Sequence, residues 1–239
     1  MNLGGDERIY PASMTKIMTA LLAIENLSDL DETIAVPEDI FEELTAQDAS
    51  VAGFNPYEQV TVRDLLYGVL LPSGADACET LARTVGGSED GFVNMMNQKA
   101  EELGLINTHF ENCTGLHNDN HYSTCRDIAI LMDECLKSDT FREIVTTEVY
   151  TTEATTSHPE GITLYDTMLH RFTSYEMSTT LENGAVIEGG KTGFTDEAGQ
   201  CLVSFAEYEG EEYILVTAEA MTDSGSAVDS IADASTVYG

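Results

Sequence analysis

A serine and a lysine three positions apart stand at the head of the first apolar stretch of this chain. Ser13 and Lys16 belong to residues 11–22, which otherwise hold a proline, threonines and small or apolar side chains. Residues three apart on a helix share a face, so the lysine amine is expected one turn beyond the serine hydroxyl. A serine hydroxyl needs an adjacent base to act as a nucleophile, and a lysine serves when burial or a nearby cation lowers its pKa. The spacing therefore predicts a buried helix that begins with a nucleophile and its base.

A second lysine falls in a short motif much later in the chain. The sequence has only four lysines, and Lys191 opens the triplet Lys191-Thr192-Gly193. A Ser-x-x-Lys motif followed by a Lys-Thr-Gly motif is a known catalytic signature. A charge on Lys191 near Lys16 would also lower the pKa of the Lys16 amine.

The composition is strongly acidic. The 239 residues include 43 acidic and 10 basic side chains, a formal net charge of −33. Such a charge repels phosphate backbones and anionic lipids, so we expect no nucleic-acid partner. Hydrophobic residues make up 42% of the sequence, enough for a packed core. No apolar run reaches about 18 residues and no basic segment leads into an apolar one at the start, so neither a membrane span nor a signal peptide is predicted in this chain.

Cysteines and histidines are the remaining candidates for disulfide or metal chemistry. The five cysteines form no Cys-x-x-Cys pair, and an odd number leaves at least one free in a monomer. Cys113 and Cys125 flank a polar segment and are the pair considered for a disulfide, although buried free thiols are the simpler interpretation. One set repeats every fourth residue and would form a zinc-binding stripe on a continuous helix: His109, Cys113, His117, His121 and Cys125. Because glycine and asparagine interrupt this stretch, we expect a loop there and no metal or other cofactor.

Helical patterns come first in the chain and strand patterns later. They predict helices at about residues 12–27, 37–44, 65–71, 73–85, 88–103, 124–137 and 226–238, with Ser73, Ser88, and Ser123 or Thr124 as N-caps. Strands are predicted at about residues 148–156, 185–188, 201–207 and 213–219. This order favours an α+β fold with helices against one antiparallel sheet. We expect a single domain over residues 1–239, in which a helical part (about 12–140) packs against a sheet formed mainly by about 145–239.

The order of three motifs is the strongest family signal. Ser13-Met14-Thr15-Lys16 comes first, Ser73-Gly74-Ala75 second and Lys191-Thr192-Gly193 last. This order resembles the serine D-alanyl-D-alanine carboxypeptidases, the low-molecular-mass penicillin-binding proteins of the DD-peptidase and serine β-lactamase superfamily. Further stretches that look like this family are residues 11–19, 70–77, 107–110, 115–117 and 121–124. The resemblance covers almost the whole chain and implies the DD-peptidase fold.

The resemblance implies a role for each catalytic motif residue. Ser13 would attack the carbonyl of the penultimate D-alanine, Lys16 would take its proton, and Ser73 would relay a proton to the leaving amine. Substrate binding would fall to Lys191, Thr192 and Gly193. The oxyanion hole would be formed by the backbone N–H groups of Ser13 and Phe194.

The implied activity is cell-wall chemistry. A member of this family would trim the terminal D-alanine from peptidoglycan stem peptides through an acyl-enzyme, and penicillin and other β-lactams would acylate it. Such an enzyme would act in cell-wall metabolism and cell shape, outside the cytoplasm, in the cell envelope or secreted.

Three departures from the family pattern stand out. Ala75 replaces the asparagine that usually ends the second motif, and no Lys or Arg follows Lys191, where many relatives carry an arginine for the substrate carboxylate. Only ten residues precede Pro11, so the first strands of the family's sheet are expected to be missing.

Two alternative functions follow from these departures and from the shared motifs. A β-lactamase would share all three motifs, but the Glu-x-x-x-Asn pattern of class A enzymes is not found between Glu143 and Asn183. A non-catalytic protein that binds wall peptides or β-lactams is the other alternative, favoured by Ala75 and the missing arginine.

Overall fold

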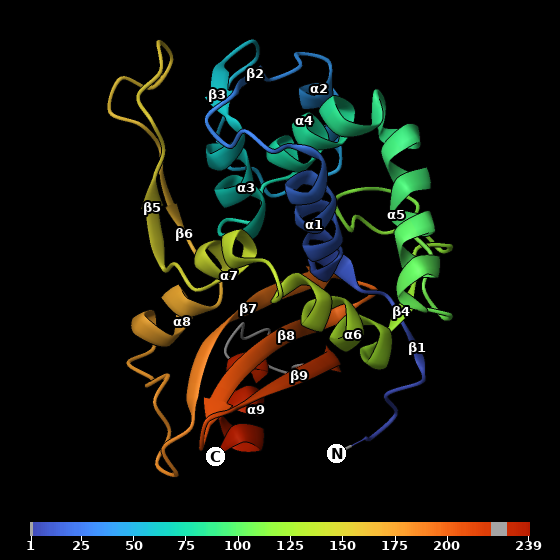
Figure 1. Ribbon diagram of the computed structural model, residues 1–239, viewed down its shortest axis with the longest axis vertical. Helices are drawn as coiled ribbons and strands as arrows, with labels where there is room; N and C mark the ends of the chain where they lie inside the picture. Colours follow the sequence, from blue (N-terminus) through green and yellow to red (C-terminus); the bar gives the residue numbers. More distant parts are fainter. Residues whose placement is uncertain (1, 221–228) are drawn as a thin grey trace.

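An apolar helix, α1 (Lys16–Asn26), runs through the middle of the helical part (Figure 1). The computed structural model describes residues 2–220 and 229–239. The first eight residues of α1 are all buried, because a helix that is apolar on every side needs neighbours all round. Helices that contact it are α3 (Val62–Leu70), α4 (Ala75–Gly86), α5 (Glu89–Leu103), α6 (Cys125–Cys135) and α7 (Asp139–Val145). The remaining helical segments are the 3₁₀ turn η1 (Ala12–Thr15), α2 (Ile40–Ala46), α8 (Leu169–Ser174) and α9 (Asp229–Tyr238).

A three-stranded antiparallel sheet lies below these helices, in the order β7 (Val186–Thr195), β8 (Gly199–Tyr208), β9 (Glu211–Ala220) (Figure 1). Side chains of β8 alternate between two hydrophobic cores, as the period of a strand requires. Cys201, Val203 and Phe205 join the large core under the helices. Leu202 and Ala206 join a smaller core with α8 and α9 on the opposite face. The sheet is therefore covered by helices on both faces.

Three two-stranded ladders complete the described strands. They pair β1 (Arg8–Ile9) with β4 (Ser123–Thr124), β2 (Thr33–Ala35) with β3 (Gln59–Thr61), and β5 (Val149–Thr151) with β6 (Thr163–Tyr165). The β1–β4 pair brings the start of the chain beside the start of α6. The loop between β5 and β6 projects upward beside β3, away from the large sheet (Figure 1).

Most predicted elements are present, with informative differences at their ends. Ser88 caps α5 by accepting the Gly91 N–H, and Thr124 caps α6 by accepting the Asp127 N–H, as expected. Ser73 is not an N-cap: Gly74 occupies that position, and Ser73 has a left-handed φ of +66°. The short helices α7 and α8 were not predicted. The closing helix is described over Asp229–Tyr238, and residues 226–228 of the predicted range lie outside the described residues.

The considered Cys113–Cys125 disulfide is wrong, since all five cysteines are free thiols. The two side chains serve different regions of the protein. Cys113 is fully buried and its Sγ lies 3.5 Å from Oε1 of Glu79 on α4, whereas Cys125 begins α6, where burial and the charge of Glu219 on β9 raise its pKa. Among the described residues, no helix has the length and apolar character needed to span a bilayer.

Candidate active site

Ser13 and Lys16 meet at the junction of η1 and α1. The Lys16 Nζ lies 3.0 Å from Ser13 Oγ and donates a second hydrogen bond, of 2.5 Å, to the Thr114 carbonyl. Lys16 is 3% exposed, and this burial lowers its pKa, although nearby Cys78, Cys113 and Asp76 act in the opposite direction. A base must be neutral to accept a proton, so burial favours the state in which Lys16 can activate Ser13.

A tight backbone contact fixes the position of Ser13. The preceding Ala12 has a φ of +45°, which is a strained region for a residue with a side chain. Gly115, itself at φ +83°, lies so close that an added Cβ would be 1.9 Å from the Ala12 carbonyl oxygen. Only glycine fits there, and the loop that carries it also supplies the Thr114 carbonyl to Lys16.

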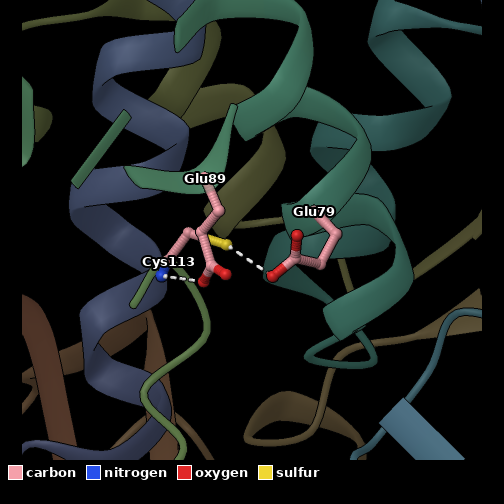
Figure 2. A group of neighbouring side chains, drawn as sticks. All are labelled: Glu79, Glu89 and Cys113. Carbon is pink, nitrogen blue, oxygen red and sulfur yellow. Dashed lines mark hydrogen bonds between the residues drawn. The ribbon is translucent and has the colours of Figure 1, made fainter. Parts of the chain in front are cut away.

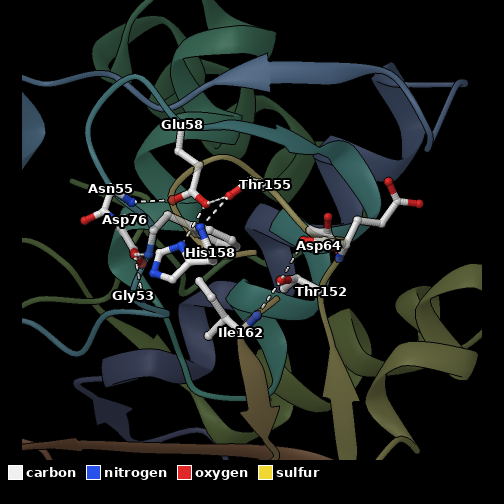
Figure 3. Close-up of polar contacts among 11 residues, drawn as sticks. Gly53, Asn55, Glu58, Asp64, Asp76, Thr152, Thr155, His158 and Ile162 are labelled. Carbon is white, nitrogen blue, oxygen red and sulfur yellow. Dashed lines mark hydrogen bonds and ion pairs between the residues drawn. The ribbon is translucent and has the colours of Figure 1, made fainter. Parts of the chain in front are cut away.

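The second motif places a strained serine at the start of α4. Ser73 is 6% exposed, and its hydroxyl is buried without a hydrogen-bond partner in the described structure. Strained backbone and unpaired buried polar groups both concentrate at functional sites. Asp76, in the first turn of α4, holds residues 52–54 in place. Its carboxylate accepts the N–H groups of Ala52, Gly53 and Phe54 at 2.7–3.1 Å (Figure 3). Burial raises the pKa of Asp76, and these backbone hydrogen bonds oppose that rise.

The third motif lies on β7, the edge strand of the large sheet that runs past Ser13. An added Cβ on Gly193 would lie 3.1 Å from the Ser13 nitrogen, so the absence of a side chain permits the close approach. Lys191 is fully buried and donates a hydrogen bond of 3.0 Å to the Thr192 carbonyl. Burial and, next in size, the charge of Lys16 lower its pKa to about 7. Phe194, which follows Gly193 in β7, is 55% exposed.

The structure therefore brings Ser13, Lys16, Lys191 and Gly193 together from two separate parts of the chain. Thr192 is also at the site, where its hydroxyl lies 2.7 Å from the Thr167 hydroxyl. Helix α4, which starts next to Ser73, carries Cys78 into electrostatic contact with both Lys16 and Lys191. The arrangement can activate a hydroxyl and bind an anion beside an extended strand edge.

A cavity of about 740 Å³ opens beside these residues and is markedly acidic. Thr114, Leu116 and Phe194 are among its lining residues. Its carboxylates are Glu43, Asp48, Glu79, Glu89, Glu111, Asp196 and Glu197. No local sequence pattern indicates this cavity, because its acidic residues come from four distant segments.

Glu79 and Glu89, which line this cavity, form a cluster with Cys113 (Figure 2). Their ligand atoms lie within 4.8 Å of one another, a spacing that could hold a metal ion. Burial, together with the charge of Glu89 and a hydrogen bond to it, raises the pKa of Glu79 to about 7. Glu79 also pairs with Arg83 at 3.3 Å. The buried Glu79 carboxylate thus has a hydrogen-bond partner and an ion-pair partner within the protein.

His121 was considered as a zinc ligand, and its ring nitrogens both have partners within the protein. Nδ1 accepts the Glu111 N–H at 3.1 Å, so Nε2 carries the proton and donates it to the Thr15 hydroxyl at 2.8 Å. Burial lowers the His121 pKa to about 3. His121 thus supports the turn between Ser13 and Lys16 as a neutral imidazole.

A serine bonded to a buried lysine at a helix start, beside an edge strand with a second buried lysine, defines an active-site serine enzyme on an α+β fold. The profile of the D-alanyl-D-alanine carboxypeptidase family, peptidase S11, matches residues 2–222. The chain belongs to this serine-type D-Ala-D-Ala carboxypeptidase family, which confirms the resemblance seen in the sequence.

Individual relatives are similar in sequence to this protein over most of its length. The D-alanyl-D-alanine carboxypeptidase DacF of Bacillus subtilis is 35% identical over 222 residues, 92% of this chain and 54% of the relative. The carboxypeptidase of Streptomyces sp. K15 is 37% identical, covering 91% of this chain and 74% of the relative. The chain thus spans about half the length of the Bacillus relative.

Solved structures confirm the α+β DD-peptidase fold. The crystal structure of the Streptomyces K15 DD-transpeptidase matches with a TM-score of 0.86 and 32% identity, covering all of this chain and 90% of that one. The D-alanyl-D-alanine carboxypeptidase of Mycobacterium tuberculosis matches with a TM-score of 0.78 and 26% identity, covering 97% of this chain and 81% of that one.

Proposed function

We propose that this protein is a serine D-Ala-D-Ala carboxypeptidase that trims the terminal D-alanine from peptidoglycan stem peptides and is acylated by penicillin. The observation that carries the proposal is the 3.0 Å contact between Lys16 Nζ and Ser13 Oγ, with Lys16 buried and β7 alongside. Family membership supports the reaction class.

The residues divide the chemistry between them. Ser13 Oγ attacks the carbonyl carbon of the penultimate D-alanine while Lys16 takes the hydroxyl proton. The N–H groups of Ser13 and Phe194 bind the oxyanion, and such donors contribute several kcal/mol to transition-state stabilisation. The free hydroxyl of Ser73 passes a proton to the leaving amine, so the C–N bond breaks and D-alanine departs. Water then hydrolyses the ester on Ser13.

Substrate binding falls to the β7 edge. The stem peptide lies extended along Lys191, Thr192 and Gly193, and Gly193 allows its backbone close to Ser13. No Lys or Arg follows Lys191 in the sequence, so its ammonium and the Thr192 hydroxyl bind the terminal carboxylate. Ala75 supplies no amide to this site, which leaves the Thr114 carbonyl as the second partner of Lys16.

The place of action follows from the substrate. Peptidoglycan lies outside the cytoplasm, so we propose an extracytoplasmic enzyme of the cell envelope, or a secreted one, that affects cell shape. Residues 1–239 would act as a single catalytic domain.

The direct experiment is release of D-alanine from diacetyl-Lys-D-Ala-D-Ala, with Ser13→Ala as the matched control. The proposal predicts release by the wild-type protein and none by the variant. Binding of the peptide without release would replace the proposal with the non-catalytic binder. Turnover of nitrocefin without release of D-alanine would favour a β-lactamase instead.

A further inference from the structure

A buried aspartate outside the three motifs lies next to the third motif. Asp166 sits between β6 and α8 and is 1% exposed. Its Oδ1 accepts the backbone N–H groups of Met168 at 2.8 Å and Leu169 at 2.6 Å. These bonds fix the carboxylate at the first turn of α8.

The two residues that follow Asp166 contact β7 on either side of Lys191. Thr167 Oγ1 lies 2.7 Å from Thr192 Oγ1. An added Cβ on Gly190 would lie 2.9 Å from the sulfur of Met168. The segment that carries Asp166 is therefore packed against the part of β7 that carries Lys191.

The charged groups that act on Lys191 are of both signs, and the cations outnumber the carboxylate. The described ionisable groups that act on Lys191 are the cations Lys16 and Arg171, the thiol of Cys78 and the carboxylate of Asp166. Burial raises the pKa of Cys78 to about 12, so this thiol is neutral at pH 7. Asp166, whose pKa burial raises to about 7, is thus the group in this described set that opposes the two cations when it is ionised.

Asp166 and Lys191 each shift the pKa of the other. Burial and the charge of Lys16 lower the pKa of Lys191, and Asp166 raises it. Burial raises the pKa of Asp166, while the Leu169 N–H and the charges of Lys191 and Arg171 lower it. Each charge therefore favours the charged state of the other.

The proposed reaction needs two neighbouring lysines in opposite states. Lys16 must be neutral to accept a proton, whereas Lys191 must be charged to bind a carboxylate. Enzymes separate such pairs by giving each group a different environment. We propose that Asp166 is a positioning residue that acts through Lys191, as the buried counter-ion that keeps the Lys191 ammonium charged for the substrate carboxylate. This inference rests on the proposed carboxypeptidase function.

Asp166→Asn tests the inference, because asparagine keeps an oxygen that accepts both helix N–H groups and loses only the charge. The substrates are diacetyl-Lys-D-Ala-D-Ala and its C-terminal amide, with kcat and KM measured from about pH 6 to pH 9. For the carboxylate substrate we expect KM to rise about tenfold, the factor that corresponds to one unit of pKa. We expect kcat to change little, the alkaline limb of kcat/KM to move to lower pH, and the preference for carboxylate over amide to fall.

Asp127→Asn is the matched control. Asp127 is a 2% exposed aspartate on α6 that accepts the Asn107 N–H at 2.9 Å, and it lies outside the proposed machinery. This variant should keep the KM, pH profile and substrate preference of the wild type. If Asp166→Asn does not fold, Asp166→Ser also supplies an oxygen acceptor at this helix start.

The outcomes separate the inference from the proposed function. A wild-type protein that releases no D-alanine would overturn the function. If the wild type is active, an Asp166 variant with unchanged KM, pH profile and substrate preference would overturn the counter-ion role. An equal loss with the carboxylate and the amide would also overturn it, because that result indicates general damage to the site.

Discussion

Lys16 and Lys191 are the same residue type in similarly buried positions, and burial lowers the pKa of both. The neutral fraction of Lys16 grows as pH rises through its lowered pKa. The charge of Lys191, whose pKa lies at about 7, is lost as pH rises through that value. A rise in pH therefore favours the proposed role of Lys16 as a base and disfavours the proposed role of Lys191 as a cation.

A bell-shaped pH profile is the first prediction. The rate constant of acylation by benzylpenicillin should rise on the acid side as Lys16 loses its proton, and fall on the alkaline side as Lys191 does. Lys16→Ala should lower the rate by at least about 100-fold, since a positioned general base contributes about 10²- to 10⁴-fold. Stopped-flow measurement of acylation between about pH 5 and pH 10 checks both points. A flat profile, or full activity in Lys16→Ala, would remove Lys16 from its role.

Ser73 provides the second residue-level prediction. Its φ of +66° costs a residue with a side chain about 1–3 kcal/mol, and glycine adopts this conformation without strain. Ser73→Gly should therefore unfold at equal or higher urea concentration, offset only by the greater freedom of glycine in the unfolded chain. The same variant should lose most D-alanine release, because it lacks the hydroxyl. A variant that is destabilised and yet fully active would contradict this assignment.

At the scale of elements, the sequence predicted what local chemistry determines. Serine or threonine caps at α5 and α6, and the apolar pattern of α1, are signals that a single segment carries. Ser73 was predicted as the N-cap of α4, but Gly74 takes that position. Hydrogen bonds from residues 52 and 54 to Asp76 hold the start of α4 in another conformation. The Asp166–Lys191 pair and the acidic cavity join segments far apart in the chain, so no local pattern predicts them.

Glu58 is a buried carboxylate that binds the loop between β5 and β6, which also donates the Glu153 N–H to Asp64 (Figure 3). Glu58 Oε1 accepts from the Thr155 hydroxyl and from Nδ1 of His158 at 2.8 Å, and Oε2 accepts the Asn55 N–H at 2.8 Å. Burial raises the pKa of Glu58, but these hydrogen bonds outweigh that effect and leave its pKa lowered. A lowered pKa means that the stabilisation is present above about pH 4.3, the ordinary value for glutamate, and is lost as pH falls through the lower folded value.

Glu58→Gln should loosen this loop. We expect faster amide hydrogen exchange over residues 152–162 at neutral pH and a loss of stability of about 1–3 kcal/mol. The stability difference from the wild type should shrink as the pH falls below about 4. Glu160→Gln, at an exposed position of the same loop, is the control and should change neither the amide hydrogen exchange nor the stability. Equal exchange in both variants would show that Glu58 does not hold the loop.

At the scale of the whole molecule, the net charge of −33 acts on every part of the fold. Like charges repel more strongly in the compact state than in the unfolded chain, and salt screens this repulsion over about 10 Å at 0.1 M. We expect the Tm to rise as NaCl is increased from about 0.02 M to about 0.5 M. Thermal unfolding followed by circular dichroism measures this shift. A Tm that falls with salt would mean that attractive ion pairs dominate the surface.

The proposed reaction requires that the Ser13 hydroxyl, activated by Lys16, becomes the acyl acceptor at the edge of β7. Intact-mass spectrometry after incubation with benzylpenicillin, followed by peptide mapping, tests it most directly. We expect one added penicillin on the peptide that contains Ser13, and none in a folded Ser13→Ala variant. A folded wild-type protein that gains no mass, or gains it at another residue, would show that Ser13 is not the acyl acceptor.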